Sequence, residues 1–436
     1  MSTTQRRVVI TGLGLVSPLG SSAPALWEAL VAGRSAVAPI TQFCADSLPT
    51  QVAAEATQFT GAIENFGPLE KTLQRTIKKG LKVMCREIQM GVAAAQHALV
   101  DAQLDPSIRQ PERTGVTFGS DYIITLPDDY VDAVKACTDE AGRFQFSQWA
   151  ERGIPQIDPL WLLKYLPNMP ASHVAIYNDL RGPSNSITLR EASANLTLGE
   201  AYSTIQRDSA DVILAGATGT RVHSIRSLHV VMQEEFAGGT QADPTKRSRP
   251  FDRQRSGQVL GEGAAVLVLE ERQAALKRGI RLLGEILGHG SAVVHRGQLG
   301  PDLETAITIA IQKALGSAQR SPAQIGHIHA HGLSTVGGDR AEAKAIRNVF
   351  GDQSIPVVAA KSNFGNLGAG GGLVELIASL TALEHGHLFP TLNYEDPDPD
   401  CPIAVCRSAS VPAGDCFLNI SYTPQGQATA VVVGQP

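Results

Sequence analysis

The segment GPSNSITLREASANLTLGEA, residues 182 to 201, reads as an extended run, a sharp change of period and then a helix. This is the outline of an active-site elbow, and Glu191 stands at its pivot, where such an elbow usually carries a nucleophile. A carboxylate is a weak nucleophile toward a thioester, and it would have to form an acyl anhydride, a more reactive product. The residue type therefore argues against acyl transfer through this position.

Two other roles for Glu191 remain open in the sequence. An acid in the first turn of a helix is stabilised by the helix dipole by about 0.3 to 1 kcal/mol. Glu191 could also pair with Arg190 or Lys361, as a structural plug in a silent site. If burial raises its pKa instead, a protonated Glu191 could give a proton to a carbanion.

Three histidines alternate in the stretch HIHAH, and alternation along a strand would put His327, His329 and His331 on one face. A metal-dependent hydrolase could use such a group. A zinc site needs three or four ligands, however, and the sequence holds no second cluster at ligand spacing. We therefore expect no metal site and keep the hydrolase as a distant alternative.

Two glycine-rich stretches imitate nucleotide-binding loops. GLGLVSPLG, from Gly12, lacks the third glycine of a dinucleotide fingerprint, and Arg34 stands where its acid would be. GNLGAGGG, from Gly365, lacks the lysine and hydroxyl residue of a phosphate-binding loop. We interpret both as structural turns.

Composition describes a globular chain with a large core. The 436 residues are 43% hydrophobic and 18% charged, and the net charge of -5 gives no reason to expect nucleic acid as a partner. No apolar run is long enough to span a membrane, and the N-terminus lacks the apolar core of a signal peptide, so a cytoplasmic protein is expected. Six scattered cysteines without a CxxC pair suggest neither zinc nor disulfides.

Short apolar runs alternate with amphipathic stretches along the chain, which predicts a layered α/β fold with much parallel pairing. Strands are expected at residues 6–14, 114–120, 210–218, 264–271, 325–331 and 355–362. Helices are expected at residues 81–102, 194–208, 303–318, 339–350 and 371–386. A boundary near residue 265 divides the chain into halves 1–265 and 266–436, and the irregular interval 126–170 is expected to cover a surface or an entrance.

Several motifs in fixed order resemble the landmarks of the elongating β-ketoacyl-acyl-carrier-protein synthases. They are VVITGLGLVSPLG, LPNMPASHVAI, GPSNSITL, ADVILAGAT, RPFDRQRSGQVLGEGAAVLVLEE, AHGLSTVGGDRAEAKAI and KSNFGNLGAGGGLVEL, and the similarity runs from about residue 6 to 433. The resemblance implies the thiolase fold, an α/β architecture of two duplicated halves stacked in five αβαβα layers and normally dimeric.

In that family a cysteine at the elbow takes an acyl chain from a carrier protein, and two histidines stabilise the oxyanion formed when malonyl-carrier protein loses carbon dioxide. By this resemblance Glu191 replaces the cysteine, His331 is the first histidine and Asn366 replaces the second. The family's lysine matches Lys361. A polar pair that supports the site matches Asp339 and Glu342.

The departures continue beyond the nucleophile. Ala194 replaces a glycine three places after the pivot, and the mobile gate near the C-terminus reads SYTPQGQA from Ser421. Family members without the cysteine are of two kinds: decarboxylases that make acetyl starters, and chain-length factors that pair with an active ketosynthase. We expect this chain to be unable to condense, and to be either a malonyl-carrier-protein decarboxylase or a non-enzymatic subunit of a heterodimer.

Under the decarboxylase hypothesis, His331 and the Asn366 amide could both donate to an enolate oxygen. A charged Glu191 would oppose the binding of malonate unless a cation lies between them, because two carboxylates about 4 Å apart repel by roughly 4 kcal/mol at an effective dielectric near 20.

Either role implies an acidic carrier protein as partner and no cofactor beyond the carrier's phosphopantetheine arm. A basic docking patch is expected in RTIKKGLK, on or near the helix predicted at 81–102, with Arg75, Lys78, Lys79 and Lys82 as its cations. The second subunit would be another copy of the chain or a cysteine-bearing ketosynthase.

Overall fold

The first half of the chain forms a sheet that mixes parallel and antiparallel strands. The computed structural model describes residues 6–238 and 243–436. The strands run in the order β1-β7-β6-β4-β5, with the last three parallel and β7 antiparallel to both β1 and β6. Their bounds are Val8–Val16 for β1, Thr114–Ser120 for β4, Ser184–Thr188 for β5, Val212–Thr220 for β6 and Leu260–Glu271 for β7.

The second half repeats this topology strand for strand. The order β8-β13-β12-β9-β10 has the same alternation of antiparallel and parallel neighbours, and β11 extends the edge beyond β10. The bounds are Gly284–Val293 for β8, His327–His329 for β9, Pro356–Val358 for β10, Ala404–Val405 for β11, Cys416–Tyr422 for β12 and Gln427–Gly434 for β13. Hydrogen bonds between β1 and β8 join the two halves at one end. The predicted duplication is confirmed.

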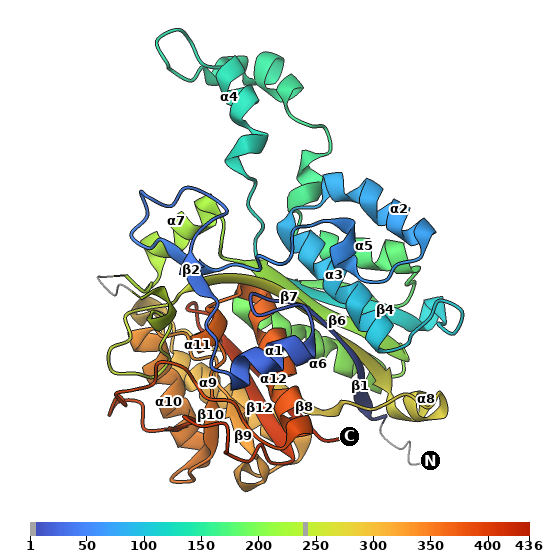
Figure 1. The fold of residues 1–436 in the computed structure, drawn as a ribbon, viewed down its shortest axis with the longest axis vertical. Helices are drawn as coiled ribbons and strands as arrows, with labels where there is room; N and C mark the ends of the chain where they lie inside the picture. The colour runs from blue at the N-terminus through green and yellow to red at the C-terminus, as the bar shows by residue number, and fades with distance from the viewer. Residues whose placement is uncertain (1–5, 239–242) are drawn as a thin grey trace.

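Helices fill three layers around the two halves of the sheet (Figure 1). Helix α6 (Ser193–Gln206) and helix α12 (Gly371–His385) lie between the halves, because each contacts strands of both. Helices α3 (Arg86–Asp101) and α5 (Met169–Asn178) cover the outer face of the first half. Helices α9 (Leu303–Ala318) and α10 (Val336–Phe350) cover that of the second. The result is the predicted five-layered αβαβα arrangement.

Strand β7 is buried on both faces, which explains the continuous apolar run in its sequence. Ala265, Leu267 and Leu269 point into the central core, while the residues between them, Ala264, Val266 and Val268, pack in the outer core of the first half. A strand buried on both faces reads as a continuous apolar run rather than as an alternation. The boundary expected at residue 265 lies inside β7, which belongs to the first half. The strands of the second half begin with β8, so the two halves of the topology divide between β7 and β8.

Several element bounds differ from the predictions. The helix expected at 81–102 begins only at Arg86, because a 3-10 turn (Leu81–Val83) precedes it. The basic stretch lies in a separate helix, α2 (Lys71–Gly80), and in that turn. The strand expected at 355–362 ends at Val358, and Lys361–Phe364 forms the short helix α11.

The remaining elements are short. They are the paired strands β2 (Val37–Pro39) and β3 (Val52–Ala54) and the helices α1 (Ala23–Val31), α4 (Val131–Ala136), α7 (Ser224–Gln233) and α8 (Arg272–Lys277). Across residues 6–238 and 243–436, no helix combines the length and apolar character that a membrane span requires.

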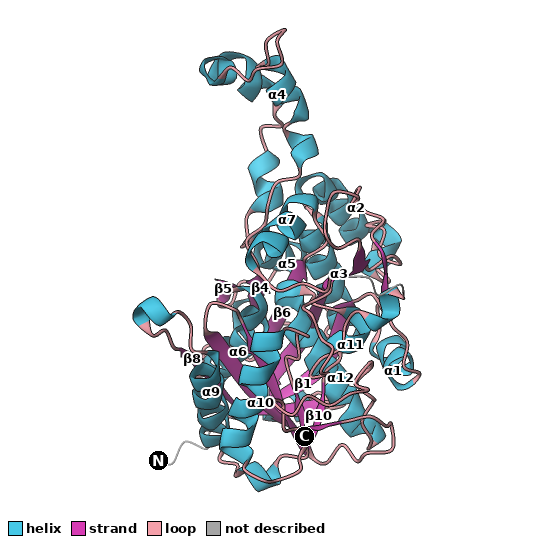
Figure 2. Cartoon of the chain, turned by 90° about the vertical axis from the view of Figure 1, so that its left-hand side faces the viewer, coloured by secondary structure: helices cyan, strands magenta, loops and turns pink. Residues whose placement is uncertain are grey.

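The segment of residues 122–168, here called the arm, projects from the body over most of its length in both views (Figures 1 and 2). Its ends stay against the body, because Tyr122 packs on Arg226 and the turn Trp161–Tyr165 contacts Leu81–Val83. The arm contains α4 and several short helical turns, held together by contacts among Tyr130, Trp149 and Trp161. It also exposes large apolar side chains, and Phe146 is 77% exposed. The interval expected to cover a surface or an entrance therefore extends away from the rest of this chain.

Candidate active site

The elbow is built at the point where β5 and its neighbour β4 both end. Ser120 and Thr188 are partners in the last register of this parallel pair. Arg190 then adopts a left-handed backbone conformation with φ 53°, which is uncommon for a residue other than glycine. The Ser193 hydroxyl accepts from Leu189 N at 2.8 Å and donates to Ser120 O at 3.0 Å, so it ties the turn to β4. Glu191 is thereby held at the pivot and is only 1% exposed.

The Glu191 carboxylate is bound by cations and an amide. Its Oε1 atom accepts hydrogen bonds from Arg221 Nη2 and, at 3.0 Å, from Asn366 Nδ2. Its Oε2 atom lies 3.3 Å from Arg190 Nε as an ion pair without hydrogen-bond geometry. Burial alone would raise the pKa of Glu191, but Arg190, Arg221 and the Asn366 amide outweigh it and hold this pKa below its usual range. The side chain is therefore an ionised carboxylate at neutral pH.

Arg221, which sequence reasoning missed, is the main cation of the site. It follows β6 directly, is fully buried and lies 3.2 Å from Asp121 as well as against Glu191. Strand β6 is parallel to β4, so Arg221 and Asp121 leave the same edge of the sheet beside the elbow. An arginine immediately after a buried parallel strand was the signal that could have identified it, because functional groups gather at the carboxyl ends of such strands.

Lys361 pairs with Glu375 and not with Glu191, contrary to one of the pairings that the sequence allows. Its Nζ atom also lies 3.1 Å from Nδ1 of His331. An ammonium group can only donate, so Nδ1 accepts and the imidazole proton resides on Nε2. Burial and then the Lys361 charge lower the pKa of His331 well below its usual value, so the ring is neutral.

His331 consequently offers one N–H to the site. Its Nε2 atom is buried and finds no hydrogen-bond partner in the part of the chain that the structure describes. The ring packs against Tyr422, with 4.4 Å between the centroids. His331 is thus a neutral donor in a fixed orientation.

Two buried carboxyl groups hold the loop that carries His331. Glu342 accepts from His331 N at 2.6 Å and from Gly332 N at 2.9 Å, and Asp339 accepts from Leu333 N at 2.9 Å. Burial raises the pKa of Glu342 to about 8 and that of Asp339 to about 6. All three hydrogen bonds come from backbone amides, so Glu342 and Asp339 fix the position of the loop.

The Asn366 amide is fully engaged. Oδ1 accepts from Gly368 N at 3.0 Å, which fixes the orientation of the amide because a backbone N–H can only donate. Nδ2 donates to Glu191 Oε1 at 3.0 Å and to Gln258 Oε1 at 2.7 Å. Both amide hydrogens are therefore used, and an enolate could receive one only after one of these bonds breaks.

These contacts close into a ring of five side chains, here called the polar ring. Gln258 Nε2 donates to Glu234 at 2.8 Å, and Glu234 pairs with Arg190 at 2.5 Å. The Arg190 contact with Glu191 and the two bonds of Asn366 complete the ring. Arg190 Nη1 also donates to Gln425 at 3.2 Å, which connects the ring to the C-terminal loop of the expected gate.

A cavity of about 250 Å³ adjoins the polar ring. Glu234 and Gln258 contribute to its wall, together with Leu333, Thr335 and Tyr422. Neither Glu191 nor Asn366 is among the residues that line this cavity. Two members of the polar ring, Glu234 and Gln258, thus line the cavity, whereas the Glu191 carboxylate does not.

The other two histidines of HIHAH have structural partners. His327 Nδ1 donates to Ala413 O at 2.7 Å, and the ring stacks on Phe417. His329 donates to Ser379 Oγ at 2.7 Å and accepts from Ala360 N at 3.3 Å. Among the described residues, no group of three or more histidines, cysteines, aspartates and glutamates could hold a metal ion.

The four expected docking cations lie on the surface, away from the elbow. Arg75, Lys78 and Lys79 belong to α2 and Lys82 to the turn after it, and all four are exposed. Within residues 6–238 and 243–436, none of the four forms an ion pair. They form a basic patch whose charge is available to an acidic partner.

Known proteins share both the sequence pattern and the fold of this chain. The model of the β-ketoacyl synthase N-terminal domain matches residues 5–275, and that of the β-ketoacyl synthase C-terminal domain matches residues 283–395. The chain is 34% identical over 404 residues to 3-oxoacyl-[acyl-carrier-protein] synthase 2 of Coxiella burnetii, covering 92% of this chain and 91% of that protein. It is 33% identical to the tetracenomycin polyketide synthase ketoacyl synthase alpha subunit of Streptomyces glaucescens, covering 99% and 98%. The solved structure of the ishigamide ketosynthase/chain length factor superposes with a TM-score of 0.82 at 27% identity, covering 99% and 100%.

Proposed function

The chain belongs to the β-ketoacyl synthase family, and we propose that within it the chain is a non-condensing subunit that pairs with a cysteine-bearing ketosynthase. The pair would build fatty-acid or polyketide chains on an acyl carrier protein. The observation that carries the proposal is the state of Glu191, an ionised carboxylate bound by Arg221, Arg190 and Asn366 at the position of the family's nucleophile.

The contacts of Glu191 oppose a covalent role. To attack a thioester, the carboxylate would have to leave Arg221, whose guanidinium is fully buried. Removing one partner from a buried ion pair costs about 3 to 5 kcal/mol, because the other charge is left uncompensated. The acyl anhydride product would add to this cost. Glu191 therefore acts as a plug held in place by its own charge.

The exposed faces of the chain support a second subunit. The arm carries large apolar side chains in the open, including Phe146, Ile154, Leu160 and Leu162. Strand β5 ends the strand order of the sheet and leaves its outer edge unpaired within the described residues. Apolar patches and free strand edges of this kind are usually covered by a partner. The similar structure of the ishigamide ketosynthase/chain length factor, whose name joins these two kinds of subunit, is a precedent for such a pair.

The carrier protein has a candidate docking surface in the basic patch of Arg75, Lys78, Lys79 and Lys82. No cofactor of the chain's own enters the proposal, since the phosphopantetheine arm of the carrier would bring the acyl group. Patches of this kind raise association rates with acidic partners more than they raise affinity.

One observation favours a second candidate function, decarboxylation of malonyl-carrier protein. His331 presents an unpartnered N–H on Nε2, within the described chain, and this is the donor that an enolate oxygen requires. The second donor, Asn366, would first have to leave Gln258 or Glu191. The malonyl carboxylate would also meet the charge of Glu191. We therefore rank this function below the partner subunit.

The experiment that separates the two functions uses malonyl-carrier protein and mass spectrometry of the carrier. If the chain is a partner subunit, it makes no acetyl-carrier protein alone, and mixing it with a cysteine-bearing ketosynthase from the same genome raises the yield of extended chains. That gain survives His331→Ala. Acetyl-carrier protein made by the chain alone, and lost in His331→Ala, would instead establish the decarboxylase. Condensation by the chain alone that Glu191→Gln abolishes would overturn both.

A further inference from the structure

A cavity of about 730 Å³ lies in the first half, under helix α2. Its walls come from α2 and the chain just before it, from the C-terminal end of α3 with the turn that follows, and from the C-terminal end of α5. Small-molecule sites are commonly about 300 to 1,000 Å³ and mainly apolar. The apolar lining side chains include Leu69, Leu73, Leu99, Leu104 and Ile176.

This cavity is remote from the elbow along the strands. Helices α3 and α5 end next to it, and the chain runs from them toward the starts of β4 and β5. Glu191 comes after the C-terminal end of β5, so it lies at the opposite end of the strands from the cavity. A ligand in this cavity would therefore not compete directly for the polar ring.

Two hydrogen-bond donors on the cavity wall lack partners among the described residues. Gln96 is 3% exposed, and its Nε2 atom makes no hydrogen bond to any residue that the structure describes. Arg109 uses Nη1 to donate to Asn178 O at 3.0 Å, while its buried Nε atom has no partner there. A buried donor without a partner is unfavourable, so a ligand oxygen that accepts from it would stabilise the complex.

The Arg109 charge is not neutralised at contact distance. Within the described chain, no carboxylate lies within 4 Å of its guanidinium. The two nearest acids, Asp105 and Asp179, line the same cavity, as does Glu70. Asp179 pairs with Arg181 at 2.8 Å, and Asp105 accepts from Ser107 N at 2.8 Å. Arg109 is thus a half-buried cation with an open side, which suits a carboxylate because a guanidinium binds it through paired N–H groups.

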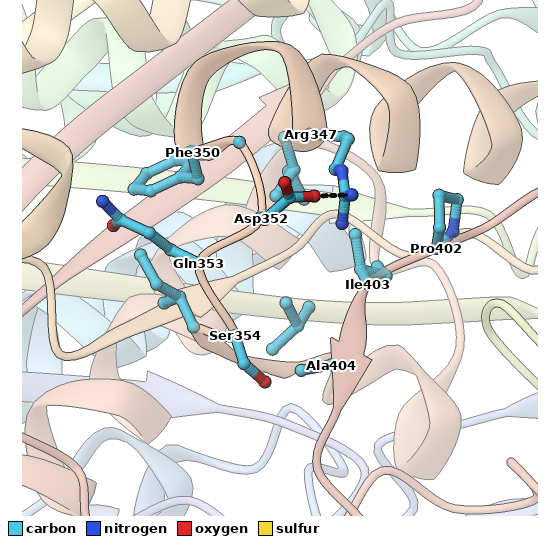
Figure 3. A pocket seen from close by; sticks show the side chains of 12 residues that line it. Arg347, Phe350, Asp352, Gln353, Ser354, Pro402, Ile403 and Ala404 are labelled. Carbon is cyan, nitrogen blue, oxygen red and sulfur yellow. Dashed lines mark hydrogen bonds and ion pairs between the residues drawn. The ribbon is translucent and has the colours of Figure 1, made fainter.

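The cavity drawn in Figure 3 provides a contrast. It measures about 330 Å³ and lies beside the end of α10, with Arg347 on its wall. Figure 3 shows Arg347 paired with Asp352, which also lines that cavity. Its cation is therefore already neutralised, which makes Arg347 a suitable control position.

We propose that the cavity under α2 binds an aliphatic carboxylate, a free fatty acid, with its chain among Leu69, Leu73 and Leu99 and its carboxylate on Arg109. Gln96 supplies a second donor on the same wall. Helix α2 forms one side of the cavity through Leu73 and Thr76 and carries Arg75, Lys78 and Lys79 on its exposed side. The bound acid would contact the basic helix from beneath and hold it against α3 and α5.

The test is calorimetric titration of the full chain with dodecanoate and, separately, with its methyl ester. Dodecanoate should bind with one site per chain, and the ester, which lacks the charge, should bind about tenfold more weakly. Arg109→Gln should weaken dodecanoate binding by a similar factor, while Arg347→Gln should leave it unchanged. Thr76→Trp, which fills the cavity from an exposed helix position, should weaken acid and ester alike.

Hydrogen exchange locates the ligand. Dodecanoate should slow exchange in residues 69–80 and leave the elbow at residues 188–193 unchanged. Equal binding of acid and ester, or full binding by Arg109→Gln, would overturn the proposal. So would protection confined to the elbow, which would place the acid in the site around Glu191. Absence of binding together with a change of oligomeric mass in Thr76→Trp would also overturn it, and would show that a second copy of the chain covers this face.

Discussion

The Nδ2 atom of Asn366 lies 3.0 Å from Oε1 of Glu191, so one hydrogen bond joins the two positions at which the sequence resemblance places the family's cysteine and second histidine. The bond belongs to the polar ring and uses a donor that an oxyanion would need. The two replacements are therefore physically coupled: the carboxylate occupies the amide, and the amide helps to keep the carboxylate ionised.

Replacing Glu191 should cost more stability than its hydrogen bonds alone would suggest. Glu191→Gln removes one of the two ion-pair partners of the buried Arg221 and leaves Asp121 at 3.2 Å, with Glu234 beyond contact distance, so the free energy of unfolding should fall by about 3 to 5 kcal/mol. Glu200→Gln, on the same helix α6 but in the exposed pair with Arg207, should cost less than about 1 kcal/mol. Urea titration followed by circular dichroism measures both. Equal losses in the two variants would contradict the description of Glu191 as a charged plug.

A thiol introduced at the pivot should be unusually acidic. In Glu191→Cys, Arg190 and Arg221 would face the sulfur at the start of α6, and nearby cations and helix N-termini lower the pKa of a thiol. The ultraviolet absorbance of a thiolate should therefore persist at pH 6 in the difference spectrum between Glu191→Cys and the unchanged chain, in which native cysteines such as Cys44 cancel. Loss of this absorbance at about pH 8.5, where an ordinary thiol takes up its proton, would show that the arginines do not act on this position.

The contribution of Glu342 to stability should fall as the pH rises from about 4.5 toward 8. Burial raises the pKa of Glu342 in the folded chain to about 8 from an ordinary value of 4.5, so the folded state binds more protons than the unfolded state between these values. Stability is then highest below the unfolded pKa and is lost as the pH passes through the folded one. Asp339 and Lys361 face the same group and contribute to its titration. Glu342→Gln should lower the melting temperature and flatten its decline from pH 5 to 8; an unchanged slope would contradict this assignment.

The arm should be needed for partner binding but not for folding. Phe146 is 77% exposed, so Phe146→Glu should leave the melting temperature of the isolated chain within about 2 °C, in line with a surface change of less than about 0.5 kcal/mol. Binding to the cysteine-bearing ketosynthase should weaken at least about tenfold, since buried aromatic anchors dominate interfaces. Leu299→Glu, at a position 85% exposed on the second half, is the matched control. Equal effects of the two changes in native mass spectrometry would remove the arm from the interface.

Carrier-protein binding should depend on charge at α2. The double variant Lys78→Glu and Lys79→Glu should lower the association rate about tenfold or more at low salt, and the difference should shrink as the ionic strength rises. Lys277→Glu and Lys344→Glu reverse two exposed charges away from α2 and control for net charge. Stopped-flow fluorescence with a labelled carrier protein measures the rates. A salt-independent loss would indicate that α2 had been damaged rather than recharged.

The layers and the pivot could be predicted because both follow from local pattern. Alternating apolar runs and helices give the order of elements, and the change of period at residues 188–193 places Glu191 at a buried turn. The partners of Glu191 could not be predicted in this way, because Arg221 and Asn366 come from separate loops. The nearer of these two in sequence, Arg221, is 30 positions away.

Two residues show where local reasoning failed. The sequence allows Lys361 as a partner of Glu191, but Glu375 on α12 faces the lysine inside the fold and pairs with it instead. The family resemblance places Asn366 at the elbow, where the structure also has it, yet whether its amide is free depends on Gln258, which no motif marks. The family pattern thus predicted that Asn366 lies near Glu191. It did not predict which acceptors bind the two amide hydrogens of Asn366, because these depend on all the neighbouring side chains.

The polar ring also bears on how this chain can change over evolutionary time. Its members carry charges that compensate one another, so a neutral side chain at residue 191 would leave Arg221 and Arg190 short of negative charge unless other positions changed as well. A single neutral substitution at this position would thus lower stability, whatever its effect on activity. The five positions of the ring therefore depend on one another, and a change at one of them is tolerated more readily when another changes with it.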